Sequence, residues 1–265
     1  MHNITMVKYM QIGDLVTIKN DKLAIVYKIM NIENDQAHLK GYSHRTKKIV
    51  PLNEVEKASN LLIEKENKVN ERYKKVVEEK TRKIHQKKPM FGRILHIDGD
   101  KEYLDSCLEL YKEMGINAVG VYIDENKVKN KIEALIEQLT PDIIVITGHD
   151  LYNNKGIKDL NNYENTRNFM DAIRKVRKHY LSDEVCVIAG ACGSNFEALI
   201  ASGANFASSP KRINIHTYDP AVIAIRVAST SINKTIDFEA CLKLIENGKH
   251  AFGGIETKGK MKLFM

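Results

Sequence analysis

Four short, almost uninterrupted apolar runs in the second part of the chain constrain its fold more than any other feature. Segments with helical spacing of apolar residues separate the runs, which lie at 94–97, 118–123, 142–147 and 184–189. A strand that is apolar at consecutive positions is buried on both faces, which is typical of a parallel sheet covered by helices on each side. The sequence therefore predicts an α/β domain with α/β/α layers over residues 93–265 and right-handed crossovers.

The rest of this domain is predicted from apolar spacing and turn residues. Helices are expected over 101–114, 195–202, 219–230 and 237–247, and short strands near 205–207 and 213–216, before a tail that is rich in Gly and Lys.

Residues 1–58 have a different pattern, with short apolar segments at 15–18, 23–29, 37–40 and 48–50 separated by Gly, Asn and Asp. This punctuation predicts a small β-barrel of the SH3-like kind. Residues 59–92 form a charged linker, in which Lys and Glu leave only a thin apolar stripe. We expect this linker to be helical or partly disordered and exposed to solvent.

The net charge of +7 in 265 residues, by itself, suggests an acidic partner such as nucleic acid. Residues 60–88, however, carry 10 basic and 5 acidic groups, so most of the excess lies in the linker and the domain after it is nearly neutral. No run approaches the roughly 18 apolar residues of a membrane span, and the first residues lack a basic region followed by an apolar run. We therefore expect a protein that stays in the cytoplasm, contacts no membrane and has no nucleic-acid partner.

Four cysteines are present, without CxxC spacing, which favours reduced thiols and argues against a cysteine zinc site. We expect no metal and no cofactor. Cys107, Cys186 and Cys241 lie within apolar helix faces or a strand, where a buried thiol is the ordinary interpretation. Cys192 differs because it follows an apolar strand and precedes a Ser194-x-x-Glu197 capping box. A thiol before a helix N-terminus is expected to have a lowered pKa, which suits a nucleophile.

Open parallel sheets bind ligands outside the carboxyl ends of their strands. His149 follows the third apolar run directly, just as Cys192 follows the fourth. If these strands are neighbours, the imidazole and the thiol emerge at the same edge and could perform acyl transfer. Each residue also has a structural interpretation, as a hydrogen-bonded turn histidine and a buried thiol. His216 is the rival candidate for the base.

Several blocks of sequence resemble a known family of peptidases. The arrangement of His149 and Cys192 is similar to that of the caspase-like cysteine peptidases. One hydrophobic strand is followed by a turn that contains the His, another is followed by Ala-Cys, and the Cys comes 43 residues after the His. The blocks 11–16, 95–100, 141–150, 189–192 and 203–210 together look like the YabG family of sporulation-specific peptidases in that clan. The resemblance implies a caspase-like fold, with Cys192 as nucleophile and His149 as general acid.

The same resemblance implies further roles for strand-end residues. The oxyanion hole would use the backbone N–H groups of Cys192 and of the residue after the histidine, where the clan usually has Gly and this chain has Asp150. Clan relatives commonly line the P1 pocket with a charged residue from the end of the first strand, which here carries Asp98 and Asp100. Acidic residues there would select Arg or Lys before the cleaved bond, with Arg favoured because a guanidinium can bind a carboxylate bidentately. Asp100 could equally cap the helix that follows.

The family resemblance also implies partners and a setting. The expected substrates are spore coat proteins or precursors of germination proteins. They would be cleaved in the sporulating cell, in the cytoplasm or at the spore coat. The sequence does not indicate the oligomeric state. Arg72 and Arg82 in the charged linker are sites that such an enzyme could cut in itself.

Three other functions compete with a peptidase. A receiver-like regulatory domain would use the acidic residues at strand ends, but it gives no role to Cys192. A small-molecule acyltransferase could use the same thiol. Residues 1–58 could bind nucleic acid, although they lack an aromatic and basic surface pattern.

Overall fold

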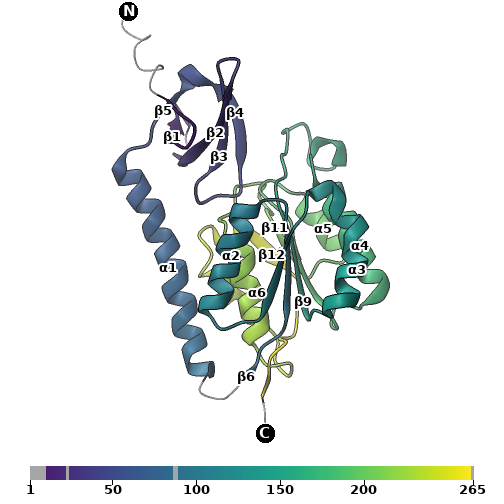
Figure 1. Ribbon diagram of the computed structural model, residues 1–265. Helices are drawn as coiled ribbons and strands as arrows, with labels where there is room; N and C mark the ends of the chain where they lie inside the picture. Colours follow the sequence, from purple (N-terminus) through teal and green to yellow (C-terminus); the bar gives the residue numbers. More distant parts are fainter. Residues whose placement is uncertain (1–9, 22–23, 86–88, 264–265) are drawn as a thin grey trace, which may run out of the picture. The chain divides into compact units, whose positions relative to one another are not determined.

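A computed structural model describes residues 10–21, 24–85 and 89–263 of the chain (Figure 1). The chain divides into two compact units, Met1–Arg72 and Tyr73–Met265. No helix in the described ranges is both long enough and apolar enough to cross a membrane.

The first unit contains a five-stranded antiparallel sheet with the order β4-β3-β2-β1-β5. Its core includes Val16, Tyr27 and Leu39. The strands are β1 (Leu15–Ile18), β2 (Tyr27–Glu33), β3 (Gln36–Gly41), β4 (Lys47–Pro51) and β5 (Val55–Lys57). The strand predicted at 23–29 begins later than expected, because the chain turns through Ala24, whose φ is +45°; Leu23 lies outside the described residues.

The predicted charged linker is mostly one helix, α1 (Asn60–His85). Within the first unit, Glu66 accepts a hydrogen bond from the Val26 amide at 3.0 Å. Within the second unit, Tyr73 and Val77 are buried. The linker, which is expected to be exposed to solvent, is therefore buried at Tyr73 and Val77.

The second unit is built on a six-stranded sheet with the order β12-β11-β10-β9-β7-β8. Its strands are β7 (Ile94–Asp98), β8 (Ala118–Tyr122), β9 (Ile143–Thr147), β10 (Cys186–Ala189), β11 (Phe206–Ser208) and β12 (Phe252–Gly254). The first five are parallel and β12 is antiparallel to β11. Every residue of β7, β9 and β10 is buried, which confirms the predicted parallel sheet.

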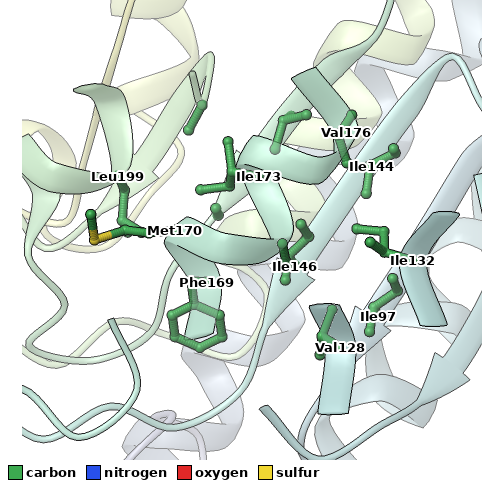
Figure 2. Packing of buried hydrophobic residues seen from close by; sticks show 14 of the residues in the cluster. Ile97, Val128, Ile132, Ile144, Ile146, Phe169, Met170, Ile173, Val176 and Leu199 are labelled. Carbon is green, nitrogen blue, oxygen red and sulfur yellow. The ribbon is translucent and has the colours of Figure 1, made fainter. Parts of the chain in front are cut away.

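Helices cover both faces of this sheet (Figure 1). One face carries α2 (Lys101–Glu113) and α6 (Asp219–Ser229), and the other carries α3 (Val128–Leu139), α4 (Thr166–His179) and α5 (Phe196–Ala201). Between the sheet and the second group of helices lies an apolar core that includes Ile97, Ile132, Ile146, Phe169 and Ile173 (Figure 2). This core holds the strands rigidly, so the loops at their carboxyl ends start from fixed points.

Two expectations near the end of the chain are wrong. Residues 213–216 form a loop instead of a strand, and the last helix, α7 (Phe238–Leu242), is shorter than 237–247. Strand β12 lies in the tail that is rich in Gly and Lys. A small ribbon of β6 (Pro89–Met90) and β13 (Lys262–Leu263) completes the unit.

Candidate active site

The loops after β9 and β10 begin side by side because the two strands pair in parallel. Ile146 of β9 is the partner of Ala189 of β10. His149 and Cys192 each lie three residues beyond these partners, at the carboxyl edge of the sheet. This is the edge at which open α/β sheets bind ligands. The paired strands thus bring the predicted imidazole and thiol to neighbouring loops.

The sulfur of Cys192 lies against the backbone of Ile215. The Ile215 amide donates a hydrogen bond to Sγ at 3.2 Å, and Sγ lies 3.8 Å from the carbonyl oxygen of the same residue. The residue is 4% exposed. The amide N–H would stabilise negative charge on the sulfur, whereas burial and the neighbouring carbonyl oxygen favour the neutral thiol.

The other cysteines have the buried environments expected of structural thiols. Cys186 lies inside β10, where burial raises its pKa to about 12. Cys107 donates from Sγ to the Thr217 carbonyl oxygen at 3.4 Å, and Cys241 is fully buried. A thiol like that of Cys186 stays protonated at neutral pH and is a poor nucleophile.

Serine side chains from β11 and the next residue fix the backbone around Cys192. Ser208 and Ser209 both donate from Oγ to the Ala191 carbonyl oxygen, at 2.8 and 3.1 Å, and Ser209 Oγ accepts from the Gly193 amide. Gly190 has a φ of +111°, and a Cβ there would lie 2.3 Å from Ser208 Oγ. The loop that carries Cys192 can therefore follow this path only with glycine at position 190.

The start of α5 differs from the prediction by one residue. Asn195, and not Ser194, caps the helix through its side-chain oxygen. Ser194 instead donates from Oγ to Asp150 Oδ2 at 2.9 Å, and Glu197 forms an ion pair with Arg212. Ser194 Oγ accepts from the Ala191 amide at 2.9 Å and not from an amide of the helix, so the capping-box prediction is wrong.

Asp150 joins three segments through its buried carboxylate. Oδ1 accepts from the Asn165 amide at 2.7 Å, and Oδ2 accepts from the Thr166 hydroxyl at 2.5 Å as well as from Ser194. Burial raises the pKa of Asp150, although these donors oppose the shift. The side chain thus ties the His149 loop to the start of α4 and to the Cys192 loop; the oxyanion role expected of Asp150 concerns its backbone N–H.

The ring of His149 lies between two carboxylates. Nε2 is 3.5 Å from Asp100 Oδ2, and Nδ1 is 3.5 Å from Glu125 Oε1. Neither contact has the geometry of a directed hydrogen bond, so the attraction is electrostatic and grows when the ring is protonated. The side chain is 11% exposed and its ring centroid is 5.8 Å from that of Tyr103.

Glu125 is a site residue that the sequence analysis did not identify. It begins the short 3₁₀ turn η3 (Glu125–Lys127) after β8, and its Oε1 also accepts from the backbone N–H of His149 at 2.7 Å. Burial of Glu125 disfavours its charge, but the contacts with His149 outweigh burial and hold the pKa below its usual value. A signal was present in the sequence, since Gly99 and Gly148 precede the two polar loops at which this side chain lies.

Asp100 caps α2, which is one of the two roles predicted for this residue. Its Oδ1 accepts from the amides of Glu102 and Tyr103 at 3.1 and 3.2 Å. Its Oδ2 is the atom that faces His149. One carboxylate therefore serves the helix and the site at the same time.

Asp98 lies below the site and is fully buried. Its Oδ1 accepts from the Asp100 amide at 2.9 Å and its Oδ2 from the Thr147 hydroxyl at 2.8 Å. His96 lies in the same cluster, with Nε2 3.5 Å from Asp98 and Nδ1 2.9 Å from the Tyr111 hydroxyl. These contacts suit a residue that positions Asp100, and a direct contact between Asp98 and a substrate stays a prediction.

His216, the rival base, packs among aromatic rings. It stacks on Tyr73 with 4.5 Å between centroids, and its Nδ1 accepts from the Tyr218 amide at 3.1 Å. Tyr73 in turn donates to Asp219 Oδ1 at 2.6 Å, and Asp219 Oδ2 accepts from the His216 amide. This cluster supports the loop whose Ile215 contacts Cys192, so the ring has a clear structural use.

Both arginines predicted as self-cleavage sites lie in α1. Arg72 is exposed, whereas the side chain of Arg82 lies outside the described residues. Among the residues the structure describes, no three or more His, Cys, Asp or Glu side chains are grouped so that they could hold a metal ion.

Comparison with known proteins gives matches over most of the chain. The sequence model of the family described as YabG peptidase U57 matches residues 11–265. The sporulation-specific protease YabG of Bacillus subtilis (strain 168) is 41% identical over 179 residues, which cover 66% of this chain and 62% of that protein. The match thus spans less than two thirds of the length of this relative. No solved structure matches.

Proposed function

This chain belongs to the YabG peptidase family, and on that premise we propose that it is a cysteine endopeptidase with Cys192 as nucleophile and His149 as general acid and base. The parallel pairing of β9 with β10 carries this proposal, because both residues lie three positions beyond the partners Ile146 and Ala189. The amide of Ile215, which donates to Cys192 Sγ, supports a thiolate in the resting enzyme.

The reaction follows from the two groups. The thiolate attacks the carbonyl carbon of the scissile bond, and the carbonyl oxygen gains the negative charge. The imidazolium of His149 gives its proton to the leaving nitrogen as the C–N bond breaks, which leaves a thioester on Cys192. The neutral imidazole then takes a proton from water, whose oxygen attacks the thioester. Collapse of this second intermediate releases the carboxyl product and the thiolate, with the proton retained on His149.

Charge on the carbonyl oxygen must be stabilised in both steps. The backbone N–H groups of Cys192 and Asp150 are our candidates for this oxyanion hole, because they belong to the two loops that flank the reacting groups. The hydrogen bond from Ser194 to Asp150 supports this, since it couples the two loops.

We propose a preference for a basic residue, and Arg above Lys, before the cleaved bond. Asp100 presents Oδ2 beside His149. A guanidinium would form charge-assisted hydrogen bonds with such a group. Asp98 would contribute to this pocket by holding the Asp100 amide.

The substrates and setting are further parts of the proposal. Because the relative from Bacillus subtilis is a sporulation-specific protease, we place the activity in the cytoplasm of the sporulating cell and at the spore coat, on coat proteins or germination precursors. Self-cleavage after Arg72 or Arg82 belongs to the same proposal, as do a caspase-like fold for the second unit and an SH3-like fold for the first. A receiver-like function is disfavoured, because the carboxylate of Asp150 is buried and accepts three hydrogen bonds.

Hydrolysis of a matched pair of fluorogenic peptides, with Arg or norleucine at P1, tests the proposal. Wild-type protein should cleave the Arg peptide, and Cys192→Ala should abolish cleavage while Cys186→Ala retains it. Asp100→Asn keeps a good helix cap and should lower kcat/KM for the Arg peptide about tenfold to a hundredfold, in line with the loss of a charge-assisted hydrogen bond. Cleavage that survives Cys192→Ala would refute the assigned nucleophile, and an unchanged Arg preference in Asp100→Asn would refute the assigned pocket.

A further inference from the structure

We propose that Glu125 is a positioning residue for His149, holding Nδ1 of the ring so that Nε2 exchanges protons with the reacting groups. This inference rests on the proposed catalytic role of His149. It goes beyond that role by assigning a third residue, from a different strand end, to the site.

One oxygen of Glu125 contacts His149 at two points. Oε1 accepts from the backbone N–H at 2.7 Å and lies 3.5 Å from Nδ1 of the ring. The backbone bond fixes the carboxylate relative to the residue it serves, so the ring contact does not depend on a flexible side chain alone. At 3.5 Å the ring contact is electrostatic, and the negative charge favours a proton on Nδ1, which leaves Nε2 to exchange protons with the reacting groups.

The backbone around Glu125 is shaped to admit its side chain. A Cβ on Gly148 would lie 2.3 Å from Oε1 of Glu125, and a Cβ on Gly99 would lie 2.2 Å from the same atom. At both glycines the three nearest heavy atoms belong to Glu125. Two loops from different strands thus leave space for one carboxylate beside His149.

The charge on Glu125 persists although its side chain is only 14% exposed. The other groups that face His149 are Asp100 at Nε2 and the ring of Tyr103, and Tyr122 lies near both carboxylates. Asp100 already caps α2 with its other oxygen. Glu125, in contrast, directs Oε1 at both the backbone and the ring of His149, which is why we assign the positioning role to it.

The first test compares Glu125→Gln with Glu125→Asp and with the control Asp124→Asn. Gln keeps the acceptor for the His149 amide and removes the charge. We expect kcat to fall about tenfold to a hundredfold in Glu125→Gln, as for other residues that orient a functional imidazole, with KM within twofold. Asp should recover part of kcat, and Asp124→Asn, whose side chain is 46% exposed and pairs with Lys127, should match wild type.

The second test uses Gly148→Ala, which adds a methyl group where the Glu125 carboxylate lies. Alone, Gly148→Ala should reduce kcat about as much as Glu125→Ala does. When it is added to Glu125→Ala, kcat should fall by less than a further threefold, because the carboxylate that the methyl group would contact is no longer present. Additive losses would show that Gly148 acts through something other than Glu125.

The ring ¹⁵N chemical shifts of His149 in the full chain, with the signals assigned from His149→Gln, separate this inference from the proposed function. The tautomer protonated at Nδ1 should predominate in wild type and in Asp124→Asn, and it should lose population in Glu125→Gln. An unchanged ratio of the two tautomers, or an unchanged kcat in an enzyme that does cleave peptides, would overturn the positioning role. If wild type cleaves nothing and the ratio still changes, the proposed function fails and the contact between Glu125 and His149 stands.

Discussion

Replacing Tyr73 with phenylalanine should destabilise the second unit, because the hydroxyl makes two hydrogen bonds in a buried place. It donates to Asp219 Oδ1 at 2.6 Å and accepts from the Glu246 amide at 2.8 Å. Burial raises the pKa of Tyr73, so the phenol stays protonated and remains a donor throughout the working pH range. The change removes no carbon atom, so any loss comes from these bonds.

The expected magnitude follows from the two partners. A hydrogen bond to a charged group contributes about 1.5–3 kcal/mol and a bond to a backbone amide about 0.5–1.5 kcal/mol. Their loss should lower the free energy of unfolding by about 2–4 kcal/mol and the melting temperature by about 4–16 °C for a domain of this size. Because Asp219 also accepts from the His216 amide, next to Ile215, peptide cleavage should decrease as well.

Urea unfolding followed by circular dichroism measures the change, with Tyr122→Phe as the matched control. Tyr122 is 53% exposed and its hydroxyl lies 3.4 Å from Asp124, so the control should differ from wild type by less than about 0.5 kcal/mol. The reasoning fails if Tyr73→Phe also unfolds within about 0.5 kcal/mol of wild type.

Two further predictions concern titration and thiol reactivity. Burial raises the pKa of Asp150 above its usual 3.8, so the native protein holds this proton to a higher pH than the unfolded chain does. Relative to Asp150→Asn, the wild-type free energy of unfolding should therefore fall as pH rises from 3.8 through the native pKa. Urea unfolding of both proteins at several pH values measures this difference. Parallel plots of the free energy of unfolding against pH for the two proteins would contradict it. Iodoacetamide should label Cys192 at least tenfold faster than Cys186, whose pKa is about 12, in native protein at pH 8; equal rates by site-resolved mass spectrometry would argue against a reactive Cys192.

The parallel sheet and the edge that carries the site could be predicted from sequence because both depend on local patterns. A run such as 142–147 is apolar at nearly every position, and a strand buried on both faces needs that composition. The position of His149 and Cys192 at the strand ends follows from the same runs. Their presence on adjacent strands depends on strand order, which the sequence only suggested through the usual preference for neighbouring elements.

The contacts between distant segments could not be predicted in this way. Glu125 reaches His149 across the sheet edge, and the only local trace is a glycine before each polar loop. Ser194 has the sequence context of a helix cap, but its hydroxyl donates to a carboxylate 44 residues away and accepts from the Ala191 amide. The sequence around Tyr73 predicts only a charged helix, but its hydroxyl donates a hydrogen bond to Asp219, far along the chain.

The continuity of α1 has a consequence for the order of proteolytic events. A protease acts on transiently opened chain, and a helix opens most easily at its ends. Arg72 lies near the middle of Asn60–His85, next to the anchored Tyr73, whereas Arg82 lies in the last turn. Fraying of a single turn would expose the bond after Arg82, but opening at Arg72 requires most of one half of the helix to unwind. If the chain cuts itself at both places, cleavage after Arg82 should therefore come first, and the fragment still holding Arg72 should accumulate as the intermediate.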